Sequence, residues 1–166
     1  MKTSAGIILY KAAGPQMEVF LVHPGGPFWK NKDLGAWSIP KGEFTDEDPL
    51  EAAIREFAEE TGLRINGNFI PLTPIKQNSG KLVYAWGLQQ DIDANSICSN
   101  MFEMEWPPKS GLKKFFPEVD KSAWFFAGEA MERIVTPQAA FIKELQEILK
   151  ENKTIETTIK PLRSAP

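Results

Sequence analysis

The chain has 166 residues, of which 42% are hydrophobic and 25% are charged. These fractions are typical of one soluble globular domain with its own core, and they exclude an intrinsically disordered chain. No stretch approaches the roughly 20 apolar residues that span a bilayer, so we expect neither a membrane segment nor a signal peptide. Cys98 is the only cysteine, which excludes an internal disulfide and favours a reduced, cytoplasmic setting.

The net charge of −3 is unevenly distributed. Residues 42–62 contain eight acidic residues and one arginine, so this segment carries −7 and the rest of the chain +4. The overall charge argues against a general nucleic-acid-coating function. The clustering of carboxylates indicates a local function that needs negative charge.

The N-terminal part predicts a hairpin followed by a loop. Residues 4–10 and 17–23 are rich in β-branched and aromatic residues, as in strands, and the turn sequence AAGPQ lies between them. The Gly, Pro and aromatic residues of 24–37 predict a loop, and residues 37–39 predict a short strand.

Residues 48–61 predict a helix. Asp48 is a typical N-cap, Pro49 suits the first helical position, Glu51 completes a capping box and Gly62 ends the helix. The residues expected on its buried face recur at helical spacing: Leu50, Ala53, Ile54, Phe57 and Thr61.

Further strands are predicted at residues 69–77, 81–89, 101–106 and 122–127, and residues 107–117 predict a basic loop. A second helix is expected from Thr136 to about residue 150. We therefore expect an α+β fold with one domain over residues 1–150 and a polar C-terminal tail over 151–166.

Glu56 lies three and four residues before Glu59 and Glu60, so the three carboxylates are neighbours on one helical ridge. Like charges at this spacing repel, and folding does not require them. Carboxylate oxygens suit hard cations such as Mg²⁺ or Mn²⁺. A solvated acidic helix face is the alternative interpretation.

The segment from Gly42 to Leu63 resembles the Nudix box, which is written GX5EX7REUXEEXGU, where U is a bulky aliphatic residue. Its second half is matched from Arg55 to Leu63, with Phe57 at the first U position, and Glu47 has the correct spacing to Arg55. The loop between Gly42 and Glu47 is one residue shorter than the pattern. The resemblance extends over about residues 3–150. Segments on either side of the box resemble those of a bacterial subgroup described as predicted Nudix NTP pyrophosphohydrolases.

This resemblance implies an α/β/α sandwich around a mixed sheet and hydrolysis of a nucleoside diphosphate linked to another moiety, with Mg²⁺ or Mn²⁺ as cofactor. It implies that Glu59 and Glu60 are the principal metal ligands, that Glu56 is a further ligand or supports the catalytic water, and that the carbonyl of Gly42 is a ligand.

The resemblance also implies that Arg55 orients the glutamates and that Glu47 pairs with Arg55 as structural support. A glutamate from a later loop often joins such a site. Glu118 is our choice for this catalytic group, with Glu103 and Glu105 as competitors, and each could equally be an ordinary surface or strand carboxylate.

Other residues have weaker signals. Lys41 could bind a phosphate or face solvent, the lysines of the basic loop could attract a polyphosphate, and His23 favours a structural role. Several aromatic residues could stack on a base or belong to the core: Phe28, Trp29, Trp37, Tyr84 and Trp86.

We therefore expect a Nudix hydrolase that cleaves an NTP or a dinucleoside polyphosphate, acting as a monomer or homodimer without a nucleic-acid or membrane partner. A nucleotide-sugar pyrophosphatase of the ADP-ribose type is one alternative. A catalytically weak nucleotide-sensing module is another, although all the glutamates of the second half of the box are present. A prenyl diphosphate isomerase is a third alternative. It would need a catalytic Cys and Glu pair, and Cys98 lacks a recognisable setting for one.

Overall fold

A computed structural model describes residues 2–13 and 16–163, with side chains described as far as residue 152 except at residue 13. The described residues form a seven-stranded sheet. Its strands are β1 (Thr3–Ala13), β2 (Gln16–Pro24), β3 (Lys41–Glu43), β4 (Ile70–Pro71), β5 (Ile75–Lys76), β6 (Leu82–Gln89) and β9 (Val119–Phe126).

β1 is the centre of this sheet. It runs antiparallel to β2 and β3 and parallel to β6, and the main strand order is β4-β6-β1-β2-β9. The sheet is therefore mixed, as the resemblance implied. The β1–β2 pairing confirms the predicted hairpin, and the pairing of Ala5 with both Gly42 and Tyr84 places β3 and β6 on opposite sides of β1.

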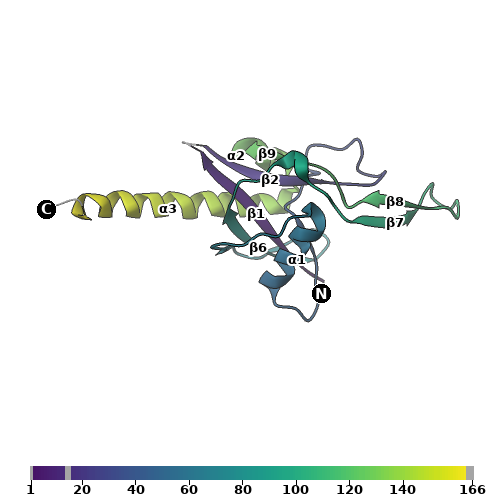
Figure 1. Cartoon of the computed structure of the whole chain (residues 1–166), viewed down its shortest axis with the longest axis horizontal. Coiled ribbons are helices and arrows are strands. Elements are labelled where there is room, and N and C mark those ends of the chain that lie inside the picture. The colour runs from purple at the N-terminus through teal and green to yellow at the C-terminus, as the bar shows by residue number, and fades with distance from the viewer. Residues whose placement is uncertain (1, 14–15, 164–166) are drawn as a thin grey trace.

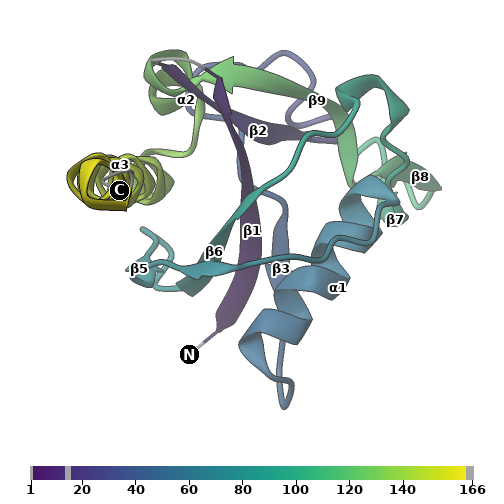
Figure 2. The same ribbon diagram turned by 60° about the vertical axis from the view of Figure 1, so that its left-hand side comes forward.

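Helices cover both faces of the sheet, with α1 (Pro49–Thr61) on one face and α2 (Ala127–Arg133) and α3 (Ala139–Arg163) on the other (Figure 2). The core on the α1 face contains Ala53 and Phe57, and the core on the α3 face contains Phe141 and Leu145. This is the expected α/β/α sandwich in an α+β fold. In the described part of the chain, no helix has the length and hydropathy needed to cross a membrane.

The ends of α1 confirm the helix signals in the sequence. The Asp48 side chain accepts a hydrogen bond of 3.1 Å from the Glu51 backbone N–H. At the other end, Gly62 has a φ of 79° and donates its backbone N–H to the carbonyl of Ala58 at 2.8 Å, a conformation that glycine adopts without a steric penalty. The buried face differs in part from the prediction, because Ala52 and Glu56 are buried whereas Leu50 and Ile54 are only partly so.

Two predicted strands are interrupted in the structure. Residues 37–39 form isolated bridges instead of a strand, because this segment divides its backbone hydrogen bonds between β2 and the end of α2. Residues 69–77 form the two short strands β4 and β5, since Pro71 and Pro74 have no N–H to continue a ladder.

The expectation of a loop over residues 107–117 is wrong for its second half. β8 (Lys113–Pro117) pairs antiparallel with β7 (Met101–Glu105), and the two strands form a separate ribbon that projects from the body of the molecule (Figure 1). The turn residues and lysines of this segment are not typical of a strand. β8 is extended because it pairs with β7. α2 was also not predicted, and α3, which follows a 3₁₀ turn at Thr136–Gln138, extends beyond residue 150 to Arg163.

Removing the N-cap of α1 should destabilise the fold. We expect Asp48→Ala to lower the free energy of unfolding by about 1 kcal/mol, because the Glu51 N–H loses its acceptor. Urea denaturation measures this loss. Asp48→Asn keeps an acceptor oxygen and is the matched control, so an equal loss in both variants would contradict the role of the cap.

Candidate functional site

The acidic ridge of α1 packs directly on β3. Glu56 is buried, with 8% of its surface exposed, and its carboxylate fills the space next to Gly42. A Cβ atom at position 42 would collide with this carboxylate. The absence of a side chain at Gly42 therefore allows a helix carboxylate to lie against the backbone of the sheet.

Arg55 connects the carboxylates of this region. Its Nε and Nη2 donate to the two oxygens of Glu47 at 3.1 and 2.7 Å, and its Nη1 donates to Glu56 at 2.8 Å and to Glu59 at 3.0 Å. The predicted pairing of Arg55 with Glu47 is present. Because one guanidinium contacts three carboxylates, it fixes the directions in which Glu56 and Glu59 point.

Glu60 is the carboxylate whose protonation is most strongly changed by its surroundings. Burial raises the pKa of Glu60 to about 8, although Lys41 opposes the shift through its charge and through a backbone N–H that donates to the carboxylate at 3.2 Å. Burial also raises the pKa of Glu56, against the effect of Arg55. The site thus holds carboxyl groups whose ionised forms are disfavoured by burial.

The later-loop glutamate Glu118 joins the same cluster. Burial and the nearby charge of Glu59 raise the pKa of Glu118, and Glu118 in turn raises the pKa values of Glu56 and Glu60. Asn100 positions it, because the Asn100 N–H donates to the Glu59 carbonyl at 2.8 Å and the Asn100 carbonyl accepts the Glu118 N–H at 2.8 Å.

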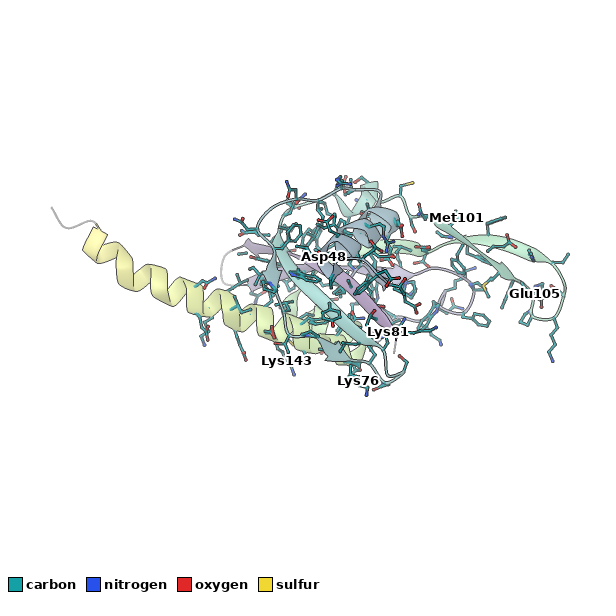
Figure 3. All side chains as sticks on the ribbon, turned by 90° about the horizontal axis from the view of Figure 1, so that it is seen from below. Asp48, Lys76, Lys81, Met101, Glu105 and Lys143 are labelled. Carbon is teal, nitrogen blue, oxygen red and sulfur yellow. The ribbon has the colours of Figure 1, made fainter. Side chains whose placement is uncertain are left out.

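The competitors of Glu118 lie on the β7–β8 ribbon. Glu103 pairs with Lys113 at 3.4 Å, and Glu105 accepts the backbone N–H of Lys109 at 2.6 Å. Figure 3 shows Glu105 at the outer end of the ribbon, well away from Asp48 at the start of α1. The structure therefore brings Glu118 to the box glutamates and leaves Glu103 and Glu105 apart from them.

The donor set fits a hard divalent cation. Glu56, Glu59, Glu60 and Glu118 offer oxygen ligands, and the charge of such an ion would favour the ionised forms that burial disfavours at Glu56, Glu60 and Glu118. Arg55 holds Glu56 and Glu59 in the present arrangement, and no three acidic, histidine or cysteine side chains of the described residues converge on one metal position. Metal binding would require carboxylates to turn toward the ion.

A cavity of about 330 Å³ lies next to this cluster. Lys41 joins the two, because its backbone contacts Glu60 and its half-buried side chain lines the cavity. Burial and the charge of Lys81 lower the pKa of the Lys41 ammonium. The cavity is also lined by Pro24, Trp29, Ala36, Ser38, Gln77, Asn78, Ser79, Val135, Pro137 and Gln138.

The loop that carries Trp29 is held by His23. The buried His23 ring has Nδ1 2.8 Å from an Asp120 oxygen and Nε2 2.6 Å from the carbonyl of Lys32. These contacts give His23 the expected structural role. Trp29 is 39% exposed at the cavity, whereas Trp37 is buried in the core.

Sequence reasoning missed Ser38, Gln77 and Gln138, whose side chains lie at the cavity. Single polar residues far apart in the chain carry no spacing signal. The fold alone brings them together.

Several solved structures share this fold. A C. elegans Ap4A hydrolase in a binary complex is 18% identical, with 91% of this chain and 99% of that chain covered and a TM-score of 0.61. The NUDIX domain of Shewanella oneidensis NrtR, complexed with ADP ribose, is 15% identical, with 89% of this chain and 87% of that chain covered and a TM-score of 0.61. A mutT/nudix family protein from Listeria innocua is 17% identical, with 93% of this chain and 97% of that chain covered and a TM-score of 0.61. At these identities the likeness concerns the fold.

A curated relative, the octanoyltransferase of Myxococcus xanthus, is 27% identical over 132 residues. The match covers 79% of this chain and 32% of that protein, so the chain spans about a third of the relative's length. The family model of the NUDIX domain matches residues 1–99, more than half of the chain, and this segment contains β1 to β6, α1 and the box-like segment 42–63. The chain belongs to the NUDIX domain family.

Proposed function

We propose that this protein hydrolyses a pyrophosphate bond in a nucleoside diphosphate linked to another moiety, with Mg²⁺ or Mn²⁺ as cofactor. The observation that carries the proposal is the cluster of four carboxyl groups beside Lys41, those of Glu56, Glu59, Glu60 and Glu118, in which burial and neighbouring carboxylates disfavour the ionised forms of Glu56, Glu60 and Glu118. Carboxylates repel phosphates, so a cation between them is needed for a polyphosphate to approach.

In this proposal the metal ligands are Glu56, Glu59, Glu60 and the backbone carbonyl of Gly42. The bound metal would supply Lewis-acid stabilisation of charge on the phosphate oxygens and would lower the pKa of a coordinated water. Among these residues, Glu60 and Glu56 have the strongest need for a cation, because burial disfavours their ionised forms.

Glu118 is the proposed general base. Its raised pKa brings the carboxylate closer to the range in which it can accept a proton from the attacking water. Its backbone is held by the Asn100 carbonyl and by the Gly25 N–H, which donates to the Glu118 carbonyl at 2.9 Å. A fixed backbone position suits a group that must receive a proton at one place.

Arg55 is proposed as a positioning residue for Glu56 and Glu59, and Glu47 supports Arg55 from the loop before α1. The shortened loop reaches this arrangement with Asp46 in the left-handed region, at a φ of 50°. The shorter spacing in the box is therefore compatible with the Glu47–Arg55 ion pair.

The proposed substrate is an NTP or a dinucleoside polyphosphate, bound as a free nucleotide by a monomer or homodimer in the cytoplasm. Lys41 would attract its phosphates, and the adjacent cavity has the size of a nucleoside site. The Ap4A hydrolase with the same fold supports this class. The NrtR domain complexed with ADP ribose favours a nucleotide sugar as the second candidate.

Removing the charge of one proposed ligand should abolish most turnover. We expect Glu59→Gln and Glu60→Gln to lower kcat/KM by about 100-fold or more on whichever nucleotide of a panel is hydrolysed with Mg²⁺ or Mn²⁺, because the ion loses a charged ligand. Quantifying the released mononucleotide measures this.

The matched control is Glu51→Gln, on the same helix but exposed and outside the cluster. It should keep nearly full activity. Wild-type rates in the Glu59 and Glu60 variants would refute the assignment of the ligands, and metal-free wild type that still hydrolyses the panel would refute the cofactor.

The raised pKa of Glu60 predicts a pH dependence of stability in EDTA. Between its ordinary value of 4.5 and about 8, the folded state retains a proton that the unfolded state releases, so the free energy of unfolding falls as the pH rises through this range. Glu60→Gln lacks this contribution. We expect the variant to gain stability over wild type between pH 5.5 and pH 8.5, measured by urea denaturation at each pH.

Adding Mg²⁺ at pH 8.5 should reverse the order by stabilising the wild type more than Glu60→Gln. A stability difference that does not change with pH would contradict the raised pKa of Glu60.

A further inference from the structure

The polar side chains at the end of the cavity form a chain of hydrogen bonds. A backbone N–H determines which groups in this chain donate and which accept. The Ile39 backbone N–H donates to Gln138 Oε1 at 3.0 Å, and Gln138 is fully buried. A backbone N–H can only donate, so this contact fixes which end of the Gln138 amide is oxygen. Gln138 Nε2 must then face the opposite way.

Gln138 Nε2 donates to Ser38 Oγ at 3.1 Å and to Gln77 Oε1 at 3.2 Å. Both hydrogens of this amide are therefore used. The second contact fixes the Gln77 amide in turn, since its oxygen faces Gln138. Gln77 Nε2 has no hydrogen-bond partner within the described ranges 2–13 and 16–152, and its two hydrogens are available at the cavity.

The backbone of Gln77 is also fixed. Its N–H donates to the Lys81 carbonyl at 2.9 Å, and its carbonyl accepts the Gly80 N–H at 2.8 Å, so it belongs to the tight turn between β5 and β6. A donor on a fixed backbone with a fixed amide orientation can discriminate between ligands that present an acceptor and ligands that present a donor.

The rest of the cavity suits a nucleobase. Trp29 offers an aromatic surface, with Lys32 Nζ 4.9 Å from its ring centre, and Lys41 is at the side of the carboxylate cluster. A base stacked at Trp29 would have its sugar and phosphates directed toward Lys41. A volume of about 330 Å³ is enough for a nucleoside.

We propose that Gln77 is a specificity-determining residue that donates to a carbonyl oxygen of the base, so that the site prefers keto bases (guanine, uracil) to the corresponding amino bases (adenine, cytosine). Guanine presents O6 and N7 as acceptors, whereas adenine presents its 6-amino group as a donor at the same place. A donor facing a donor leaves both unpaired. This inference rests on the proposed function, because it assigns the nucleoside end of the same substrate.

Binding of nucleoside monophosphates tests the inference without turnover. In calorimetric titrations with Mg²⁺, we expect wild type to bind GMP about tenfold more tightly than AMP, and UMP more tightly than CMP. Gln77→Glu replaces the donor by an acceptor and should remove or reverse both ratios. Gln77→Met, which keeps the length of the side chain, should bring the ratios close to one.

Ratios are used because the charge added by Gln77→Glu weakens all four nucleotides alike. The matched control is Gln89→Glu, an exposed glutamine at the end of β6 that lines a different cavity, and it should keep the wild-type ratios. Equal affinities in wild type, no binding of any of the four, or ratios that survive both Gln77 variants would overturn the inference.

A parallel hydrolysis assay with GTP, ATP, UTP and CTP separates this inference from the proposed function. Hydrolysis without any base preference overturns the role of Gln77 and leaves the proposed function in place. The predicted monophosphate ratios together with no hydrolysis of any nucleotide would support Gln77 and overturn the proposed function.

Discussion

The contact between the Glu56 carboxylate and Gly42 is the constraint on which the site depends. It exists because position 42 has no side chain, and it brings the acidic ridge of α1 against β3. The same approach places Glu60 on the backbone N–H of Lys41. Core residues on the neighbouring positions of α1, such as Ala53 and Phe57, hold the helix there despite the repulsion among its glutamates.

β3 therefore separates two chemically different regions. Its backbone contacts the carboxylates of α1, while the side chain of Lys41 lines the cavity with Trp29 and Gln77. Alternation of side chains along a strand makes this division, since consecutive residues point to opposite faces of the sheet. A polyphosphate substrate needs such a division, because a metal site must hold its phosphates and an apolar wall with a few polar groups must hold its base.

Local signals in the sequence predicted the parts of this arrangement that are local in the chain. Asp48 and Gly62 delimit α1 through hydrogen bonds within one helical turn, and the box residues lie within 21 positions of one another. Gln77 and Gln138 are 61 residues apart, and their contact forms where the 3₁₀ turn before α3 lies against β5. β8 was missed for a similar reason, since its order comes from pairing with β7 and not from its own composition.

Arg55 offsets part of the repulsion among the carboxylates of this site. Its guanidinium is shared among Glu47, Glu56 and Glu59, whose hydrogen bonds raise the pKa of Arg55 against the opposing effect of burial. Burial is the main cause of the raised pKa values of Glu60 and Glu118, and nearby carboxylates add to both shifts. One cation of the chain thus stabilises one side of the cluster, and the divalent ion of the proposed function would bind the side nearest Lys41. A polyphosphate held by that ion would then lie between Lys41 and Glu118, with its base directed toward Gln77.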